Sequence, residues 1–140
     1  MAPRVLVPIA LDRNGRKLND VAQGVAEVMA RISGVGDVEF VPVRQVEPIT
    51  LNAARDAREF LENQRIRSVI VVTPLFRSRR SALVYAATLG RAGIAVHCVP
   101  VQGSRGVNNW TASWHGIQQI VEQWMKLQYY RFWVLAFRVA

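Results

Sequence analysis

The chain has 140 residues, a length that fits one domain with a hydrophobic core, and we expect a single domain over residues 1–140. Its 18 Lys and Arg against 10 Asp and Glu give a formal net charge of +8, which favours anionic partners without choosing among phosphate ligands, nucleic acid and acidic lipid. The single Cys98 excludes an internal disulfide and a multi-thiol metal site, and no apolar run approaches the roughly 20 residues of a membrane-spanning helix.

Four short runs rich in β-branched residues predict buried strands. They are RVLVP near residue 4, VEFVPV near residue 38, SVIVVT near residue 68 and IAVHCVPV near residue 94. The fourth run contains His97 and Cys98, and its apolar character predicts that both side chains are buried in the core.

Helical spacing fills the intervals between these strands. The first predicted helix has an apolar stripe, Asn19 or Asp20 as its N-cap and Gly34 as its stop; the stripe comprises Val21, Val25, Val28, Met29 and Ile32. The second helix, TLNAARDAREFLENQ, is expected to begin at Thr50 as N-cap. The third, SALVYAATLGRAG, closes at Gly90 or Gly93, and a last helix runs from about residue 113 to 130.

Strands that alternate with helices are typical of parallel sheets covered on both faces. The sequence therefore predicts an α/β fold: a three-layer, Rossmann-like domain with a mostly parallel sheet of about four strands and a long C-terminal helix. Ligands in such folds bind outside the carboxyl ends of the strands. The loops that follow the predicted strands span residues 8–19, 42–50, 73–78 and 101–114.

The third of these loops, TPLFRSRRSA, places Arg77, Arg79 and Arg80 where a helix begins. Cations there oppose the helix dipole by roughly 0.3–1 kcal/mol each unless an anion is nearby. With Ser78 and Ser81 beside the free helix amides, the guanidinium groups have the donors that an oxyanion site needs. The alternative is that these arginines face solvent or pair with acids such as Glu47, Asp56 or Glu59.

Two further loops offer candidate ligand-binding or proton-transfer residues at the same edge of the predicted sheet. VEPITLN offers Glu47, Thr50 and Asn52, with Glu47 a candidate base; the alternative is a surface acid beside an N-cap. His115 opens the last helix and is either a ligand contact or proton-transfer group, or an ordinary helix-start residue. The two histidines lack neighbours at metal-ligand spacing, so no metal site is predicted. Phosphate-binding glycine loops and a hydrolase triad are absent.

Three segments together resemble the YdcF/SanA/ElyC-like family of bacterial α/β proteins, often described as a domain of unknown function. They are EPITLN, TPLFRSRR and the C-terminal WHGIQQIVEQWMKLQYYRFWVL, so the resemblance extends from Glu47 to the end. The positions that match the family motifs are Glu47, Thr50, Asn52, Thr73 and Arg80. The resemblance implies a phosphate-bearing or nucleotide-like ligand, S-adenosylmethionine included, and a role in envelope polysaccharide or lipid-carrier metabolism. It establishes no reaction.

The chain departs from the family pattern at several places. Ala53 and Asp56 stand where the family commonly has Thr and Asn, and Arg77 replaces a histidine. The family's first strand with its glycine-rich turn has no counterpart, and MAPRVLVP corresponds to the second strand. We therefore expect a domain shortened at the N-terminus, cytoplasmic as written and membrane-associated if a natural N-terminal anchor has been removed.

The aromatic C-terminal segment WMKLQYYRFWVLAF supports a function of another class. Its front half has the spacing of a helix packed on a sheet through Trp124, Leu127 and Tyr130, whereas the tail FWVLAFRVA is too apolar to be left in water. A second subunit, a membrane surface or a free sheet edge would cover it. The alternative function is thus a non-catalytic accessory protein that binds an envelope protein complex or anionic lipid; nucleic-acid binding ranks third because no recognised motif is present.

Overall fold

The computed structural model describes residues 4–12, 14–103 and 107–138. The chain folds into two compact units, Met1–Gln64 and Arg65–Ala140. Both contain strands and helices in alternation, so the predicted α/β class is confirmed. No helix in the described ranges is both long enough and apolar enough to cross a lipid bilayer.

The first unit contains β1 (Val5–Ala10), α1 (Asp20–Ile32), β2 (Val38–Val43) and α2 (Ile49–Asn63). β1 and β2 are parallel, and their register runs from Val5 opposite Val38 to Ala10 opposite Val43. α2 packs on β2, because its apolar positions fall on one side of the helix. The buried side chains of this unit include Ile9, Val41 and Val43 from the strands and Leu51, Ala54 and Leu61 from α2.

Helix α1 has the predicted ends but leaves its apolar stripe uncovered. The side chain of Asn19 accepts a hydrogen bond from the Ala22 amide (3.0 Å), and Gly34 has a left-handed φ of 70° just beyond the helix. All five predicted stripe residues are nevertheless exposed, from 52 % at Val28 to 77 % at Val21. The prediction of an amphipathic helix is confirmed, whereas burial of the stripe is not.

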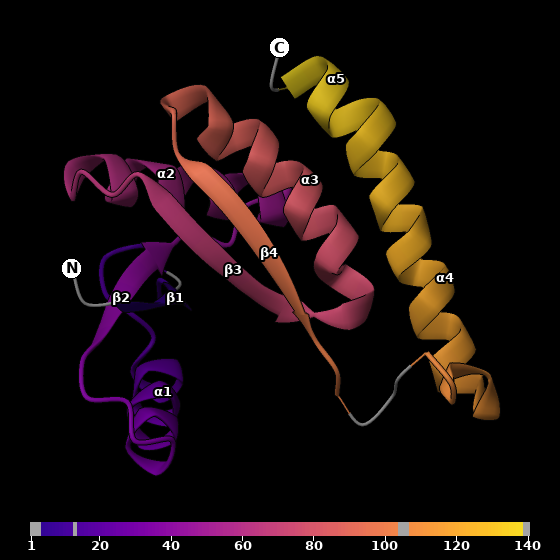
Figure 1. Cartoon of the computed structure of the whole chain (residues 1–140), viewed down its shortest axis with the longest axis horizontal. Helices are drawn as coiled ribbons and strands as arrows, with labels where there is room; N and C mark the ends of the chain where they lie inside the picture. Colours follow the sequence, from indigo (N-terminus) through magenta and orange to yellow (C-terminus); the bar gives the residue numbers. More distant parts are fainter. Residues whose placement is uncertain (1–3, 13, 104–106, 139–140) are drawn as a thin grey trace. The chain divides into compact units, whose positions relative to one another are not determined.

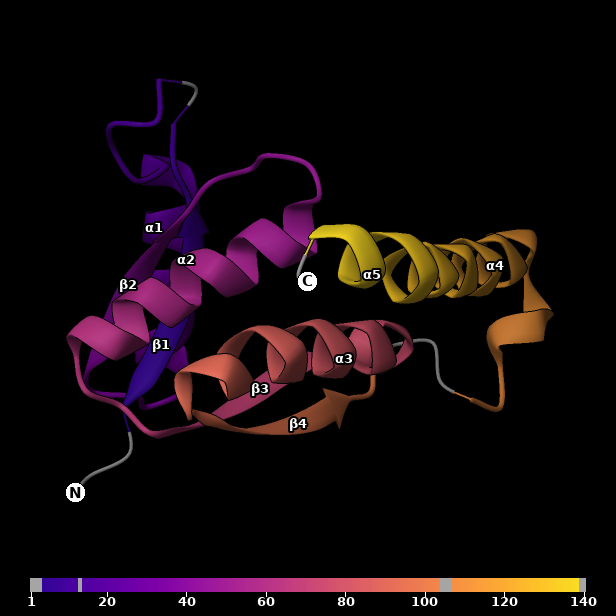
Figure 2. The same cartoon turned by 90° about the horizontal axis from the view of Figure 1, so that it is seen from above.

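The second unit is built on β3 (Ser68–Pro74) and β4 (Ala95–Val101), which are parallel in register from Ser68 opposite Ala95 to Pro74 opposite Val101. The 3₁₀ turn η1 (Leu75–Arg77) leads into α3 (Ser78–Leu89), and a second turn, η2 (Gly90–Ala92), ends at Gly93 with φ 73°. α3 covers one face of this sheet, as the two views in Figure 1 and Figure 2 show. Val84, Leu89 and Ile94 lie in its core.

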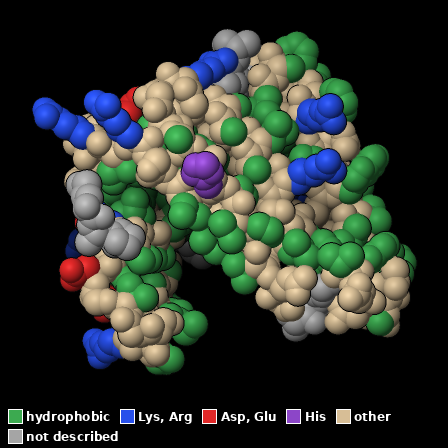
Figure 3. All heavy atoms as spheres, in the orientation of Figure 1, with side chains coloured by type: hydrophobic (Ala, Val, Ile, Leu, Met, Phe, Trp, Pro, Cys, Tyr) green, Lys and Arg blue, Asp and Glu red, His purple; other side chains and the backbone are tan. Residues whose placement is uncertain are grey.

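The opposite face of the β3–β4 sheet is open. Because side chains alternate along a strand, every second residue points away from α3. Val72 is 65 % exposed, and His97 lies on β4 opposite Ile70 with its side chain also exposed. The prediction that His97 is a core residue is therefore wrong, and Cys98, on the covered side, is half-buried. Figure 3 looks onto this face, where one histidine is surrounded partly by hydrophobic side chains.

The C-terminal part is helical over most of residues 110–138. The turn η3 (Trp110–Ala112) precedes α4 (Trp114–Tyr129), and a π-helical turn, η4 (Tyr130–Val134), continues into α5 (Leu135–Arg138). α4 lies beside α3 and touches η1 (Figure 2). Gln123 in α4 and Tyr130 at the start of η4 are buried, whereas Trp124 is 61 % exposed. The expectation that Trp124 packs in the core is wrong, and Leu127 is only half-buried.

The predicted strand positions are confirmed, but the predicted sheet is not. Among the described residues the strands form two sheets of two strands each, β1 with β2 and β3 with β4. A three-layer, four-stranded Rossmann-like sheet is thus not confirmed. The N-cap of α2 is Pro48, with an extended backbone at φ −74° and ψ 118°, so the helix begins before Thr50 and the prediction of Thr50 as N-cap is wrong.

Candidate anion site at the start of α3

The loop TPLFRSRR lies where the sequence places it, between the carboxyl end of a strand and the start of a helix. β3 ends at Pro74, η1 makes one tight turn, and α3 begins at Ser78. A helix of 12 residues carries a partial positive charge at this end, and the amide of its first residue, Ser78, donates to the Leu75 carbonyl oxygen in η1. No side chain caps α3 at its N-cap residue, Arg77.

Hydroxyl groups hold this turn in shape. The Ser78 hydroxyl donates to the Leu75 carbonyl oxygen over 2.7 Å, so its proton is already used within η1. Thr73 is only 8 % exposed, and its hydroxyl oxygen lies 3.3 Å from that of Ser81. Thr73 and Ser81 therefore form a polar pair under the first turn of α3, and Ser78 acts first as a structural residue.

The three arginines differ in their surroundings. Arg77 and Arg79 are exposed, whereas Arg80 is partly buried. Its Nε and Nη1 atoms are shielded from solvent and have no hydrogen-bond partner in the described part of the chain. Burial lowers the pKa of Arg80 from its ordinary value, and the charge of Arg77 lowers it further, while Tyr130 and Glu122 act in the opposite direction. A guanidinium nevertheless stays protonated at neutral pH, so Arg80 is a partly desolvated cation with free donors.

The aromatic ring of Tyr130 interacts with the positive charge of Arg80. The guanidinium carbon lies 5.7 Å from the centroid of the Tyr130 ring, within the range of a cation–π contact. This contact attracts the positive charge but accepts no N–H bond in the plane of the guanidinium. The aromatic ring therefore leaves the donors at Nε and Nη1 available.

Glu122 on α4 is a member of this site that sequence reasoning missed. It forms an ion pair with Lys126 one turn later, and this hydrogen bond is the main reason why the pKa of Glu122 is lowered. Arg77 and Arg80 lower the same pKa further, so the carboxylate is close enough to feel both cations. Glu122 is also the single acid in residues 65–140, a signal that counting acids by half of the chain would have found.

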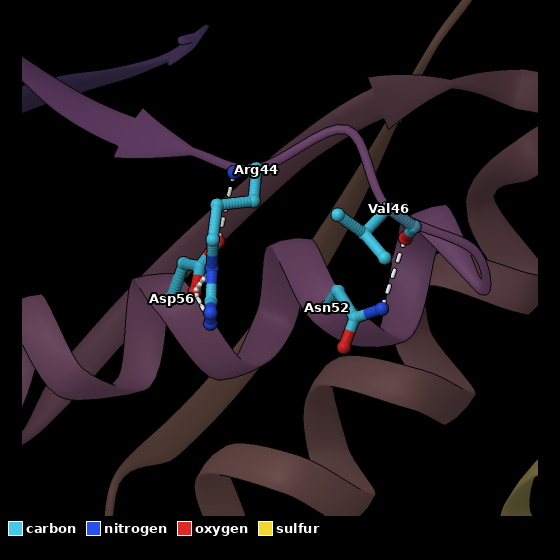
Figure 4. Close-up of polar contacts among 4 residues, drawn as sticks. All are labelled: Arg44, Val46, Asn52 and Asp56. Carbon is cyan, nitrogen blue, oxygen red and sulfur yellow. Dashed lines mark hydrogen bonds and ion pairs between the residues drawn. The ribbon is translucent and has the colours of Figure 1, made fainter. Parts of the chain in front are cut away.

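The second predicted cluster, Glu47, Thr50 and Asn52, belongs to the first unit. The side-chain amide of Asn52 donates to the Val46 carbonyl oxygen over 2.9 Å and closes the loop before α2 (Figure 4). Thr50 is the second residue of α2 and is part-buried, and the Glu47 side chain is exposed. Asn52 therefore has a structural partner, and Glu47 keeps the exposure that a base would need.

Asp56, one of the acids offered as a partner for the cluster, is bound by Arg44 instead. Its carboxylate accepts the Arg44 backbone amide (2.9 Å), Nε (3.1 Å) and Nη2 (2.6 Å) (Figure 4). Burial raises the pKa of Asp56, but the interactions with Arg44 outweigh it, and the pKa is lowered. This pair anchors the end of β2 to α2.

The remaining candidates are exposed. His115 lies in the first turn of α4 with its side chain in solvent, and Ser113 caps that helix by accepting from the Gly116 amide over 3.1 Å. In residues 4–12, 14–103 and 107–138, no three His, Cys, Asp or Glu side chains gather closely enough to hold a metal ion. No family model, curated protein or solved structure matched this chain in comparison.

Proposed function

We propose that this chain binds a phosphorylated or nucleotide-like small molecule at the start of α3, as a YdcF-like domain whose strands form one Rossmann-like sheet. Arg80 would hold the anion through its guanidinium, with Arg77, Arg79 and the partial positive charge at the start of α3 adding to the attraction. The resemblance that begins at Glu47 suggests a role in envelope polysaccharide or lipid-carrier metabolism. S-adenosylmethionine is a nucleotide-like alternative.

The observation that carries this proposal is the unpartnered guanidinium of Arg80. Desolvating a polar group without giving it a partner costs about 1–3 kcal/mol, and more for a charge, so such an arrangement is retained when a ligand supplies the acceptor. Nε and Nη1 of Arg80 are shielded and have no acceptor among the described residues. The adjacent N-terminus of α3 also favours a negatively charged ligand.

The charge of the surrounding unit supports an anionic ligand over a cationic or neutral one. Residues 65–140 contain ten Lys and Arg residues but one acid, Glu122. Glu122 is paired with Lys126 and therefore does not neutralise the arginines fully. The proposal concerns binding, because Glu47 and His115 remain only candidates for a proton-transfer role.

The test is a thermal-shift and calorimetric titration of the intact chain with inorganic phosphate, uridine diphosphate and S-adenosylmethionine, against chloride at equal ionic strength. We expect a phosphate-bearing probe to raise Tm, and we expect Arg80→Ala to abolish the rise. Arg91→Ala is the matched control, since Arg91 is exposed at the other end of α3 and the substitution removes the same charge. A rise in Tm that survives Arg80→Ala would refute the assignment of the site.

A further inference from the structure

The solvent face of the C-terminal helices carries a continuous band of exposed hydrophobic side chains, here called the aromatic stripe. It consists of Val121, Met125, Tyr129, Phe132, Trp133 and Phe137, each 49–70 % exposed. Hydrophobic side chains correspondingly line the part of Figure 3 that α4 and α5 occupy. Contiguous exposed apolar surface of this kind marks interaction sites in folded proteins.

The stripe is a property of one helix face and not of scattered positions. Apart from the adjacent Phe132 and Trp133, its members recur three or four residues apart, and Trp133 and Phe137 contact each other with ring centroids 5.0 Å apart. The opposite face of the same helices holds Gln123, Tyr130 and Val134, all at most 6 % exposed. The helical segment therefore packs through one side, and the aromatic stripe takes no part in that packing.

Charge indicates that the partner of the stripe is anionic. Residues 65–140 hold ten Lys and Arg residues against one acid, a formal net charge of +9, whereas the first 64 residues hold eight against nine, a net charge of −1. The unit that carries the stripe therefore carries the whole positive excess of the chain. Lys126 and Arg131 are exposed on the same helical segment, and the guanidinium carbon of Arg131 lies 5.4 Å from the centroid of the Phe132 ring. Long cationic side chains of this kind reach lipid headgroups.

We infer that the aromatic stripe docks on the surface of an anionic lipid bilayer, with α4 lying in the interface plane. Trp, Tyr and Phe side chains favour the boundary between headgroups and acyl chains, and a basic unit is drawn to an acidic membrane. In a second copy of the chain, residues 65–140 would bring the same net charge of +9 to the contact. Single-stranded nucleic acid binds surfaces on which cations alternate with aromatic rings, but here the aliphatic part of the side chains of Val121 and Met125 forms the N-terminal part of the stripe.

The experiment measures binding of the intact chain to vesicles by flotation. We expect binding to phosphatidylglycerol-containing vesicles, weak binding to pure phosphatidylcholine, and a blue shift of tryptophan fluorescence on binding. Phe132→Ser with Trp133→Ser should weaken binding by at least about tenfold. Lys126→Gln with Arg131→Gln should weaken it by about tenfold and reduce its salt dependence.

Matched controls separate vesicle binding through the aromatic stripe from non-specific hydrophobic binding. Val21→Ser with Val25→Ser removes two equally exposed apolar side chains from α1 and should leave vesicle binding unchanged. Circular dichroism checks that each variant is folded; if the double serine variant at 132 and 133 is not, Trp133→Phe should still lose part of the fluorescence shift. Equal binding by the stripe variant, competition by a single-stranded oligonucleotide, or a dimer dissolved by the same substitutions without vesicle binding would overturn the inference.

Discussion

The guanidinium of Arg80, at the start of α3, stacks over the ring of Tyr130, in the π-helical turn after α4, at 5.7 Å. Tyr130 is 6 % exposed, so this contact lies at the edge of the core of the second unit. It attracts the cation but leaves Nε and Nη1 without acceptors in the described structure. Packing therefore holds Arg80 in place, but its buried N–H groups lack acceptors. Removing such a desolvated charge can stabilise a protein, because its desolvation is not fully compensated.

The first prediction follows from that condition. Arg80→Met keeps the packing of the stem on Tyr130 and removes the desolvated charge, so we expect the free energy of unfolding without ligand to rise by about 1 kcal/mol, a low figure because the guanidinium is only partly buried. Phosphate should no longer raise Tm. Urea denaturation with and without phosphate measures both effects. Arg91→Met, an exposed control, should change stability by less than about 0.5 kcal/mol.

The second prediction concerns the pair of Asp56 and Arg44. Asp56→Asn removes the charge that accepts three N–H groups of Arg44, and we expect a loss of about 1–2 kcal/mol at neutral pH, limited by the exposure of Arg44. The pKa of Asp56 is lowered in the folded chain, so its contribution is present above the ordinary value of 3.8 and is lost as the pH falls below it. Denaturation from pH 7 to pH 2 should therefore show a smaller acid loss in Asp56→Asn. An unchanged acid slope would contradict the assignment.

The strands and helices were predicted well from the sequence, because the signals that define them come from residues close together in the chain. The β-branched runs contain β2 and β4 and most of β1 and β3, and Asn19 caps α1 as its position before the apolar stripe indicates. Thr50 failed as a cap because Pro48, already extended, takes that position and the helix begins at Ile49. Two residues of offset are within the ambiguity of cap signals when two candidate residues are close together.

Which side of a strand or helix faces the core was harder to predict, because the contacts that decide it join residues far apart in the sequence. In IAVHCVPV both alternating sets of residues are largely apolar, so the pattern cannot tell which set faces α3, and His97 falls on the open face. The helix after Ser113 is apolar on more than one side, which is why Trp124 was assigned to the wrong side. For the candidate site, the sequence located Arg80, but its contact with Tyr130 joins residues 50 positions apart.

The third prediction uses Cys98 as a reporter of the candidate site. Its thiol lies 3.6 Å from the Ser78 carbonyl oxygen, and burial raises its pKa above the ordinary value of 9.0. Because the thiolate is the reactive form, the rate of iodoacetamide alkylation should reach its half-maximum above pH 9 in the folded chain and at about pH 9 in urea. The chain has one cysteine, so the reaction reports Cys98 alone. A half-maximum below pH 9 in the folded chain would show that the thiol is not shielded under α3.

The fourth prediction compares two glycines with opposite surroundings. Gly116 is buried in the first turn of α4, and a Cβ there would overlap the Trp110 carbonyl oxygen and lie 2.9 Å from its carbon. Gly24 lies in α1 with nothing within 4 Å of such an atom. Gly116→Ala should therefore cost about 1–3 kcal/mol, because backbone atoms must shift, whereas Gly24→Ala should gain about 0.5–1 kcal/mol from helix propensity.

Urea denaturation followed by circular dichroism distinguishes the two outcomes by sign. Ser113→Ala is a second control at the same turn, since it removes only the cap that the Gly116 amide donates to and should cost about 1 kcal/mol. If Gly116→Ala stabilises the chain as Gly24→Ala is expected to, the close approach of η3 to α4 is wrong. The entry of the chain into α4 would then have to be revised with it, because η3 directly precedes the first turn of that helix.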